Sequence, residues 1–297
     1  MTIPYDLPLW RPPSEGRNFI LQVTIGCSYN HCSFCSMYTN KIFRARSLEH
    51  IFCDIDVCAR EWPQAHRVFL ADGDAMSLPT DTLHRILDHL HASLPRLARV
   101  SSYATPDNIN RKSLEELASL KARKLSLIYL GIESGHTDVL KRIAKGASPR
   151  GIARAIQRAQ EAELQVSCMV ILGLGGREYS ERHISATAEL VNAAPPTYLS
   201  TLQLDLHRAS APGFVPRWER YGRPFQPLND DECLGEMARL VAGVAPARPI
   251  IFRSNHASNA LALGGILPRD KESLLRTIAL ARNAEGDWLR PRSLRGY

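Results

Sequence analysis

Residues 19–38 read "FILQVTIGCSYNHCSFCSMY". The first part of this stretch, residues 19–25, is rich in apolar and β-branched residues and predicts a buried strand. Three cysteines, Cys27, Cys32 and Cys35, follow in the loop that this strand enters. The stretch therefore places a set of thiols at the C-terminal end of a strand.

The same order of a short apolar run and a helical pattern recurs along the chain. The predicted strands are residues 19–25, 67–71, 99–104, 125–132, 165–172 and 198–206. Because a helix or crossover follows each of them, the pattern predicts a parallel sheet. Six such units predict the α/β class and a partial (β/α)6 TIM-like barrel, in place of a closed eight-unit barrel.

The pattern also predicts how the chain is divided. We expect an N-terminal extension over residues 1–17 and the barrel over residues 18–206. Residues 207–297 begin with an irregular stretch rich in Pro, Gly and Arg and continue with two helical patterns and a short apolar strand. We expect this last part to be a small α/β extension that caps the barrel.

Composition narrows the class of protein. The hydrophobic fraction of 44% suits a large core, and no apolar run is long enough for a membrane span. The N-terminus has no secretory signal pattern, so a soluble, cytoplasmic protein is expected. The formal charge of +7 is spread out, and the arginine-rich C-terminal end favours a solvated basic tail over a nucleic-acid site.

The remaining unusual residues also lie where predicted strands end. They are "DGDAM" at residues 72–76, "IESG" at residues 132–135 and "GLGG" at residues 173–176. In parallel α/β folds the active site lies at the C-terminal ends of the strands. We therefore expect these segments and the cysteine loop to form one site.

The spacing of the cysteines, x4 and then x2, indicates what they hold. A structural zinc site needs four ligands, and the other cysteines are scattered. We expect Cys53, Cys58 and Cys168 to be small core residues. A cubane iron–sulfur cluster fits three thiolates better, because its fourth iron is left for a non-protein ligand. Zinc remains the alternative.

The segment "CSYNHCSFC" resembles the cysteine loop of the radical S-adenosylmethionine (SAM) enzymes, with one extra residue in the first gap. "FLADGDAM", "LGIESG" with "VLKRIAKG", and "VILGLGGRE" resemble further segments of that superfamily. Their branch contains oxygen-independent coproporphyrinogen III oxidases, tRNA methylthiotransferases and the Elongator catalytic subunit. The resemblance covers about residues 18–206 and implies a partial barrel. It also implies a [4Fe–4S] cluster on Cys27, Cys32 and Cys35, with SAM chelating the fourth iron.

The resemblance further implies contacts to SAM. Phe34 would lie beside the adenine, and Gly73 and Asp74 would meet the ammonium group. The alternative for Phe34 is a loop residue that packs inward. The alternative for Gly73 and Asp74 is a plain strand-to-helix turn. Gly173 and Gly175 would let the backbone lie against the adenine, although a glycine-rich turn is weak evidence by itself.

Glu133 ends an otherwise apolar strand, where a buried carboxylate needs a partner. The resemblance implies that a ribose hydroxyl or the ammonium of SAM is that partner. The alternative partners are Lys141, Arg142 and Lys145 in the next helical pattern.

A second polar cluster follows a short apolar strand, at residues 253–259. It could contact SAM or substrate, or it could tie the C-terminal part to the barrel. We expect Arg253 and His256 to be the catalytic candidates, Arg253 as a fork for a carboxylate and His256 as a proton carrier.

The resemblance implies an enzyme in which a reduced cluster passes one electron to SAM, and the resulting 5′-deoxyadenosyl radical takes a hydrogen atom from substrate. We favour a small-molecule substrate, because the sequence shows no second cysteine cluster, cobalamin-binding part or RNA-binding domain. RNA modification and a non-enzymatic iron–sulfur or zinc scaffold are the alternatives. A one-electron donor such as flavodoxin or ferredoxin is the expected partner, with no membrane contact, for a monomer or dimer.

Overall fold

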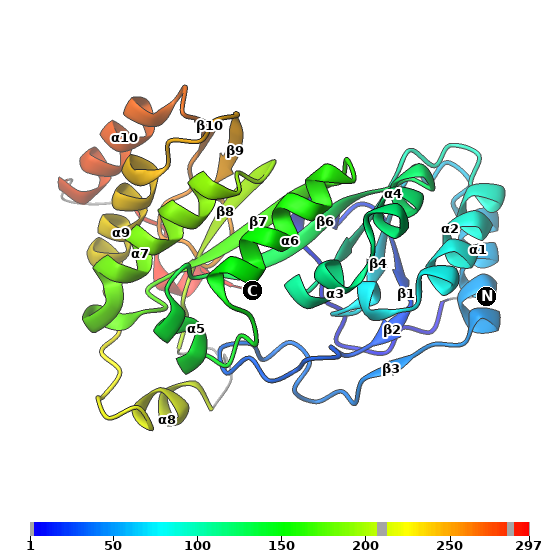
Figure 1. Cartoon of the computed structure of the whole chain (residues 1–297), viewed down its shortest axis with the longest axis horizontal. Helices are drawn as coiled ribbons and strands as arrows, with labels where there is room; N and C mark the ends of the chain where they lie inside the picture. Colours follow the sequence, from blue (N-terminus) through cyan, green and yellow to red (C-terminus); the bar gives the residue numbers. More distant parts are fainter. Residues whose placement is uncertain (1–2, 207–212, 284–287, 297) are drawn as a thin grey trace. The chain divides into compact units, whose positions relative to one another are not determined.

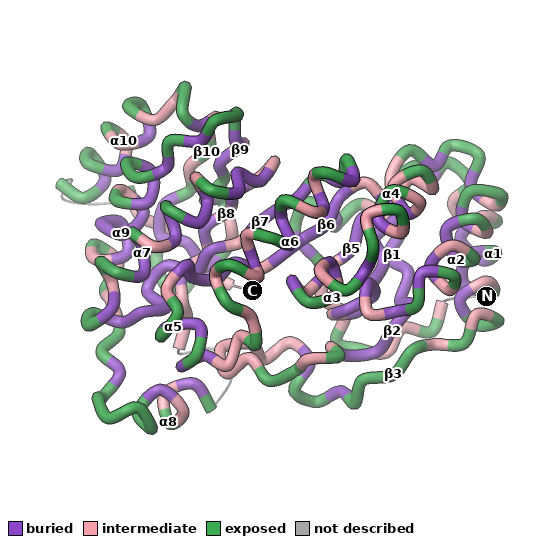
Figure 2. The backbone as a smooth tube through the Cα atoms, viewed as in Figure 1, coloured by how far each residue is buried: buried purple, intermediate pink, exposed green. Residues whose placement is uncertain are grey.

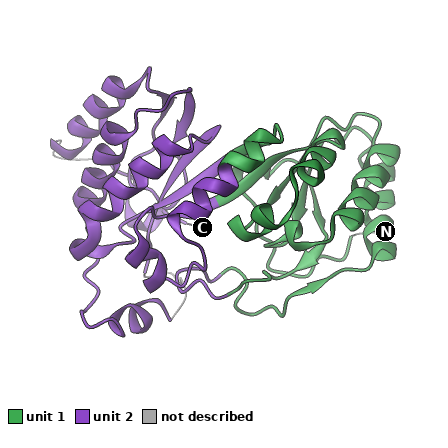
Figure 3. Cartoon of the chain, viewed as in Figure 1, with its two compact units in different colours: residues 1–30, 37–130, 157–166 green, residues 31–36, 131–156, 167–297 purple. Residues whose placement is uncertain are grey.

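The computed structural model of the chain describes residues 3–206, 213–283 and 288–296 (Figure 1). The chain forms two compact units, shown in different colours in Figure 3. Unit 1 is Met1–Asn30, Met37–Leu130 and Gln157–Val166, and unit 2 is His31–Ser36, Gly131–Ile156 and Ser167–Tyr297. Across the residues described, no helix has the length and apolar character needed to cross a bilayer.

Unit 1 is built on parallel strands that are followed by helices. The strands are β1 (Phe19–Gln22), β4 (Arg67–Ala71), β5 (Arg99–Tyr103) and β6 (Leu125–Glu133), which ends in unit 2. They pair in the order in which they occur, with Phe19 beside Val68 and Arg67 beside Arg99. The helices are α1 (Leu48–Glu61), α2 (Thr80–Ser93), α3 (Pro106–Arg111) and α4 (Leu114–Ala122). The strands are buried along most of their length, while each longer helix keeps one exposed side (Figure 2).

Side-chain caps explain where several of these helices begin. Ser47 accepts a hydrogen bond from the backbone of His50 at the start of α1, and Ser113 forms a capping box with Glu116 at the start of α4. Helix α3 was not predicted from the sequence. Thr105 and Asn108 form a second capping box there, which starts a helix where the sequence suggested only a turn.

Unit 2 continues the alternation. It contains α5 (Thr137–Arg142), β7 (Gln165–Leu172, whose first two residues belong to unit 1), α7 (Gly176–Ala193), β8 (Tyr198–Gln203), α8 (Phe214–Glu219), α9 (Asp230–Gly243), β9 (Ile250–Arg253), β10 (Gly264–Leu267) and α10 (Lys271–Asn283). Helix α6 (Pro149–Glu161) starts in unit 2 and ends in unit 1. Strands β7, β8 and β9 are parallel, and β10 is antiparallel to β9. Helices α7, α9 and α10 lie on one face of these strands (Figure 1).

The six predicted strands are all present, so the α/β class and the parallel sheet are confirmed. The first predicted strand is split at Val23, whose N–H donates to the carbonyl of Ala71, and the following β2 (Thr24–Ile25) pairs with β3 (Arg44–Ala45). Within the described residues β1 pairs only with β4 and β10 only with β9, so the barrel is not closed. The predicted division at residues 17 and 206 stays a prediction, and residues 207–212 lie outside the described part.

The start of the chain contributes to the core of unit 1. Glu15 is completely buried in the 3-10 turn Pro13–Glu15. The hydroxyl of Tyr129 on β6 donates to its Oε1 at 2.5 Å, and Arg99 on β5 donates to the same oxygen at 2.8 Å. Burial and the neighbouring Glu15 raise the pKa of Tyr129, so the phenol keeps its proton and remains a donor. These bonds fix the N-terminal segment against β5 and β6.

In unit 2, helix α7 holds the ends of two strands in place. His183 is completely buried, and its ring contacts the hydroxyl of Ser134 through Nδ1 (2.8 Å) and the carbonyl of Ile171 through Nε2 (3.1 Å). Burial lowers the pKa of His183 to about 4, so the ring is neutral at ordinary pH. The carbonyl requires the proton to sit on Nε2. A neutral imidazole thus links the turn after β6 to the end of β7.

The turn after β7 is fixed from the other side by Glu236 of α9. Its Oε2 accepts the N–H of Gly173 at 2.6 Å, where the backbone has φ +79°. Its Oε1 has no hydrogen-bond partner among the described residues, and the side chain is completely buried. Burial raises the pKa of Glu236 to about 7. The carboxyl group therefore fixes the glycine turn, and burial favours the protonated form of this group.

This arrangement predicts how stability depends on pH. Glu236 keeps its proton to a pH of about 7 in the folded chain and to about 4 when unfolded. The free energy of unfolding should therefore fall as the pH rises between these values, by on the order of 3 kcal/mol. Glu236→Gln keeps the acceptor for Gly173 and should remove this decrease, so the variant should be the more stable protein at pH 8. Denaturant unfolding across this pH range measures it.

The exposed Glu189 on the neighbouring helix α7 offers a matched control. Glu189→Gln should leave the pH profile of unfolding as it is in the parent protein. Parallel profiles for the parent protein and Glu236→Gln would contradict the prediction.

Candidate active site

The cysteine loop passes from one unit to the other. Cys27 belongs to unit 1, whereas Cys32 and Cys35 belong to unit 2. All three are partly exposed, and no disulfide forms among the described cysteines. Neither unit, over the residues described, holds three or more His, Cys, Asp or Glu side chains grouped as ligands of one metal ion. The role of the three thiols as cluster ligands therefore stays a prediction at this point.

Of the other cysteines, Cys58 and Cys168 are buried, as expected. Cys53 is exposed, so the expectation that it is a core residue is wrong. The buried side of α1 contains Ile51, Asp54 and Ile55, and Cys53 lies on the opposite side.

In unit 1, the carboxylate of Asp72 holds both ends of the loop. Asp72 is completely buried, and its Oδ2 accepts the N–H of Gly26 (3.1 Å) and the ammonium of Lys41 (2.8 Å). Lys41 also donates to the carbonyl of Asp6 at 2.7 Å. Gly26 has φ +75°, which suits glycine, and is the residue before Cys27. The segment that carries Cys27 thus begins and ends on one buried carboxylate.

Asp74 lies beside the same segment. It is completely buried, and its Oδ2 accepts the hydroxyl of Ser28. Its Oδ1 has no hydrogen-bond partner in the part of the chain that the structure describes. Burial raises the pKa of Asp74 to about 6, against the opposing effect of its hydrogen bonds to Ser28 and Asn108. One oxygen of this buried carboxylate thus has an unfilled hydrogen-bonding capacity among the described residues.

Gly73 allows the close approach between the two segments. A Cβ at this position would lie 3.0 Å from Cβ of Cys27 and 2.5 Å from the ring of Tyr38. Any side chain here would force the cysteine loop away from the end of β4.

In unit 2, the partner of Glu133 is Lys145. Their Oε1 and Nζ atoms are 2.8 Å apart, and both side chains are largely buried. They fold over Gly131, where an added Cβ would overlap Glu133 Oε1. Glu133 has φ +60°, a strained backbone for a residue with a side chain. The structure thus selects one of the three cations that the sequence left open.

The thiols of unit 2 lie near the same ammonium. Burial lowers the pKa of Lys145, but the negative charges of Glu133, Cys32 and Cys35 outweigh that effect and raise it overall. The Lys145 ammonium lies 6.0 Å from the centre of the partly exposed Phe34 ring. The loop itself is fixed by Ser33, whose N–H donates to the carbonyl of Ile143 at 2.9 Å.

Arg142, a second possible partner of Glu133, points elsewhere. Its guanidinium lies over the rings of Tyr179, Trp218 and Tyr221, at 5.0 to 5.1 Å. It also donates to the hydroxyl of Tyr179 at 3.0 Å. Because Arg142 directly precedes Ile143, this aromatic enclosure supports the carbonyl that holds the Cys32–Cys35 loop.

The two glycines expected at the adenine form the tight turn before α7. A Cβ on Gly175 would lie 3.0 Å from Cβ of Tyr179, so this position has little room for a side chain. Gly173 carries the positive φ and the bond to Glu236 described above.

The polar cluster that follows β9 is largely a structural network. Asn259 donates to the carbonyl of Thr201 at 2.6 Å, and Ser258 accepts the N–H of Gln203 at 3.1 Å. Nδ1 of His256 accepts the N–H of Ser258 at 3.1 Å, so its ring proton sits on Nε2. Burial and the charge of Arg290 lower the pKa of His256. The tie to β8, one of the two possibilities left open above, is therefore present.

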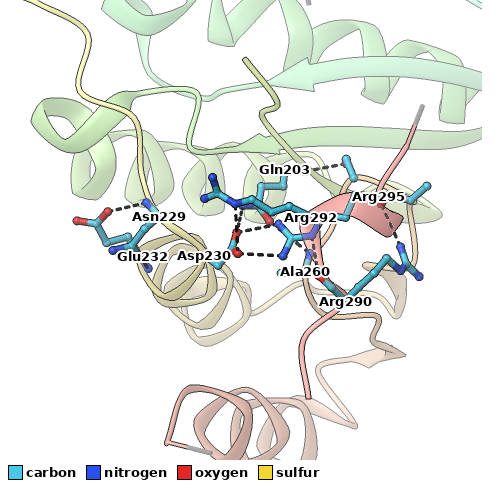
Figure 4. A network of polar contacts seen from close by, with 10 residues as sticks. Gln203, Asn229, Asp230, Glu232, Ala260, Arg290, Arg292 and Arg295 are labelled. Atoms are coloured by element: carbon cyan, nitrogen blue, oxygen red, sulfur yellow. Dashed lines mark hydrogen bonds and ion pairs between the residues drawn. The ribbon is translucent and has the colours of Figure 1, made fainter. Parts of the chain in front are cut away.

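The arginine-rich end of the chain is not a free basic tail. Arg295 is buried and forms a bidentate pair with Asp230 at 2.8 and 2.9 Å, where Gln203 also donates (Figure 4). Arg290 donates to the carbonyl of His256 at 3.2 Å. The expectation of a solvated tail is wrong, because Asp230 at the start of α9 supplies a partly buried carboxylate for it.

Two residues of this region were missed. Asp72 lies in a segment that the sequence did single out, and a second acid beside Gly73 was the available signal. Lys41 carries no local signal, because it meets Asp72 only through the fold.

Residues 21–191 match the Radical SAM superfamily. The heme chaperone HemW of Bacillus subtilis is 23% identical over 116 residues, which are 39% of this chain and 31% of HemW. The chain spans about a third of the length of the curated relatives that it matches.

Two solved structures are similar in fold. The radical SAM methyltransferase TsrM of Kitasatospora setae has a TM-score of 0.61 at 18% identity, over 84% of this chain and 55% of TsrM. Coproporphyrinogen III oxidase (HemN) of Escherichia coli has a TM-score of 0.53 at 15% identity, over 76% of this chain and 51% of HemN. TsrM has been solved with a [4Fe–4S] cluster and with a SAM analogue. These likenesses confirm the predicted partial-barrel fold.

The family match covers more than half of the chain and includes all three cysteines of the loop. This protein therefore belongs to the Radical SAM superfamily, whose members are enzymes that use a [4Fe–4S] cluster and SAM.

Proposed function

We propose that this enzyme abstracts a hydrogen atom from a small-molecule substrate. When bound, the cluster and SAM supply a one-electron cleavage of the C5′–S bond that generates the 5′-deoxyadenosyl radical. The observation that supports the binding of SAM is the unpartnered oxygen of buried Asp74, on the segment packed against Cys27. Such an oxygen fits an ammonium group, because a buried carboxylate is stabilised by a cationic donor.

The thiols also fit the cluster. Cys27, Cys32 and Cys35 are partly exposed and form no disulfide among the described residues, and thiolates are the usual ligands of iron–sulfur clusters. In our proposal these three hold the cluster, and the fourth iron is left to SAM. The Lys41–Asp72 pair fixes the segment of Cys27 within unit 1, and Lys145 places a positive charge near Cys32 and Cys35 within unit 2.

The remaining contacts to SAM follow the expectations from the sequence. We assign Phe34 to the adenine, and the backbone at Gly173 and Gly175 to the same ring system. Gly73 brings the backbone close to the ammonium beside Asp74. Glu133 is held by Lys145, which leaves its second oxygen for a ribose hydroxyl.

We assign the substrate side to Arg253 and His256. Arg253 is exposed, and His256 carries its proton on Nε2, where it could donate to a substrate. A one-electron donor such as flavodoxin or ferredoxin is required, and we place the enzyme in the cytoplasm.

Removing a thiol of the loop should remove the cluster. After anaerobic reconstitution, Cys32→Ala and Cys35→Ala should lose the brown absorbance and bound iron, because two thiolates do not retain the cubane. With dithionite and SAM, the parent protein should release 5′-deoxyadenosine and both variants should release none. Iron analysis and chromatography of the products measure these outcomes.

Cys53→Ala is the matched control, since Cys53 is exposed on α1 and outside the loop. It should keep full iron content and SAM cleavage. A Cys32→Ala variant with its full absorbance would show that the thiol does not bind the cluster.

Substitution at Asp74 should weaken SAM binding and alter its pH dependence. The carboxylate must be ionised to pair with the ammonium, so affinity should fall as the pH drops below about 6. Asp74→Asn should bind SAM about tenfold more weakly at pH 8, the loss typical of a charge-assisted hydrogen bond. The affinity of this variant should not fall further toward pH 5.5. Titration of the reconstituted protein with SAM measures both effects.

The exposed Asp81 at the start of α2 provides the control. Asp81→Asn should bind SAM as the parent protein does at each pH. Equal affinities of Asp74→Asn and the parent protein at pH 8 would rule out the assigned contact.

A further inference from the structure

Strands β7 to β10 have one face that lies opposite to the helices α9 and α10, and we call it the uncovered face. Strand pairing places Met169, Ser200, Arg253 and Gly264 in one row across the four strands. Because side chains alternate along a strand, all four project from the same face. Each of these residues is partly or fully exposed.

The opposite face is the one that packs under the helices. A Cβ on Gly265 would lie 3.2 Å from Leu274 of α10, and Gln203 donates to Asp230 of α9. Leu199 and Phe252, which share this side with Gly265, are completely buried. The alternation therefore leaves the row of Arg253 on the uncovered face of unit 2.

The next row on the uncovered face is apolar in character. It contains Tyr198, Ile251 and Ile266, all of them partly exposed. Half-exposed tyrosine and isoleucine side chains beside Met169 form a surface that an apolar or aromatic body would cover. These residues lie within one sheet, so their relative positions are fixed by its hydrogen bonds.

Arg253 brings the only charge among these positions. Its Nη1 donates to the neighbouring carbonyl of Phe252 at 2.8 Å, and it forms no ion pair with any residue that the structure describes. On the edge strand, Gly264 lies directly beside it: a Cβ added there would be 3.1 Å from Nη1 of Arg253. Other arginines of the C-terminal part, such as Arg295 and Arg282, are paired with aspartates.

We infer that the uncovered face of β7–β10 binds a substrate that combines one carboxylate with an apolar body. The carboxylate pairs with the guanidinium of Arg253, whose planar fork matches it in a bidentate manner. The apolar body covers Met169, Tyr198 and Ile251. This inference rests on the proposed function, and it adds the chemical class of the substrate.

The charges favour this class over others. A cationic ligand would meet Arg253 with no carboxylate on the face to offset it. A neutral apolar ligand would leave the guanidinium without a partner. A ligand with several phosphates would need more cations than the single arginine that these rows contain.

The test uses simple probes on the anaerobically reconstituted protein. We choose 3-phenylpropionate, its neutral amide 3-phenylpropionamide, and inorganic phosphate, measured by titration calorimetry. The carboxylate should bind at least about tenfold more tightly than the amide and than phosphate. Arg253→Gln should reduce the affinity for the carboxylate to that for the amide and leave the amide unchanged.

Two further variants keep the result interpretable. Arg276→Gln removes an exposed arginine of α10, on the helix side of the sheet, and should change neither affinity. Gly264→Leu fills the space beside the guanidinium and should weaken carboxylate binding without removing the charge.

Several results would overturn the inference. They are equal binding of the carboxylate and the amide, phosphate binding as tight as that of the carboxylate, absence of carboxylate binding, or an equal loss in Arg276→Gln. Failure of the proposed function is seen separately, as absence of 5′-deoxyadenosine when the parent protein is given SAM and dithionite. The titrations test the inference whether or not the parent protein cleaves SAM.

Discussion

The buried ion pair between Lys41 and Asp72 is the interaction on which the cysteine loop depends. One carboxylate oxygen receives both the N–H of Gly26, before the first cysteine, and the ammonium of Lys41, after the last one. Removing either partner would leave a charge buried without compensation, which is far more destabilising than replacing the whole pair. The pair therefore fixes the geometry of the loop more than it adds to stability. A loop that carries thiolates for one cluster needs this kind of constraint, since the ligands must converge before the cluster is bound.

In unit 2, the backbone at the ends of β6 and β7 is also fixed by buried polar groups, which differ in their charge states. Lys145 neutralises Glu133, whose strained backbone the ion pair helps to hold. His183 is neutral and bridges Ser134 to Ile171, so it links two strand ends without a buried charge. Glu236 fixes the glycine turn, and burial favours the protonated form of its carboxyl group. Each group binds a backbone or side-chain atom at a strand end, and together they define the backbone on which the site is built.

The sequence predicted the parts of this structure that depend on local patterns. Apolar runs located the strands, and glycine with acidic residues marked the turns at their ends, because both signals lie within a few residues of each other. It did not predict β10, whose "GGIL" sequence has too little β-branched character, or α3, which depends on a capping box. For Glu133 the sequence offered three cations, among them the observed partner Lys145, but it could not predict the partner of Asp72. Lys41 is 31 residues from Asp72, and only the completed fold brings the two together.

The distribution of partners separates groups that support the fold from groups that remain for a ligand. Glu236 and Asp74 each have a buried oxygen without a partner among the described residues, yet their settings differ. Glu236 is enclosed under α9, where holding a proton removes the cost of a buried charge. Asp74 lies beside the thiol loop, where an incoming ammonium can do the same while the carboxylate stays ionised. Arg253 is the opposite case, because its charge is exposed and costs little until a ligand arrives. A buried acid next to the cysteines and an exposed base on an uncovered sheet face thus suit two different molecules, a cationic cofactor group and an anionic substrate group.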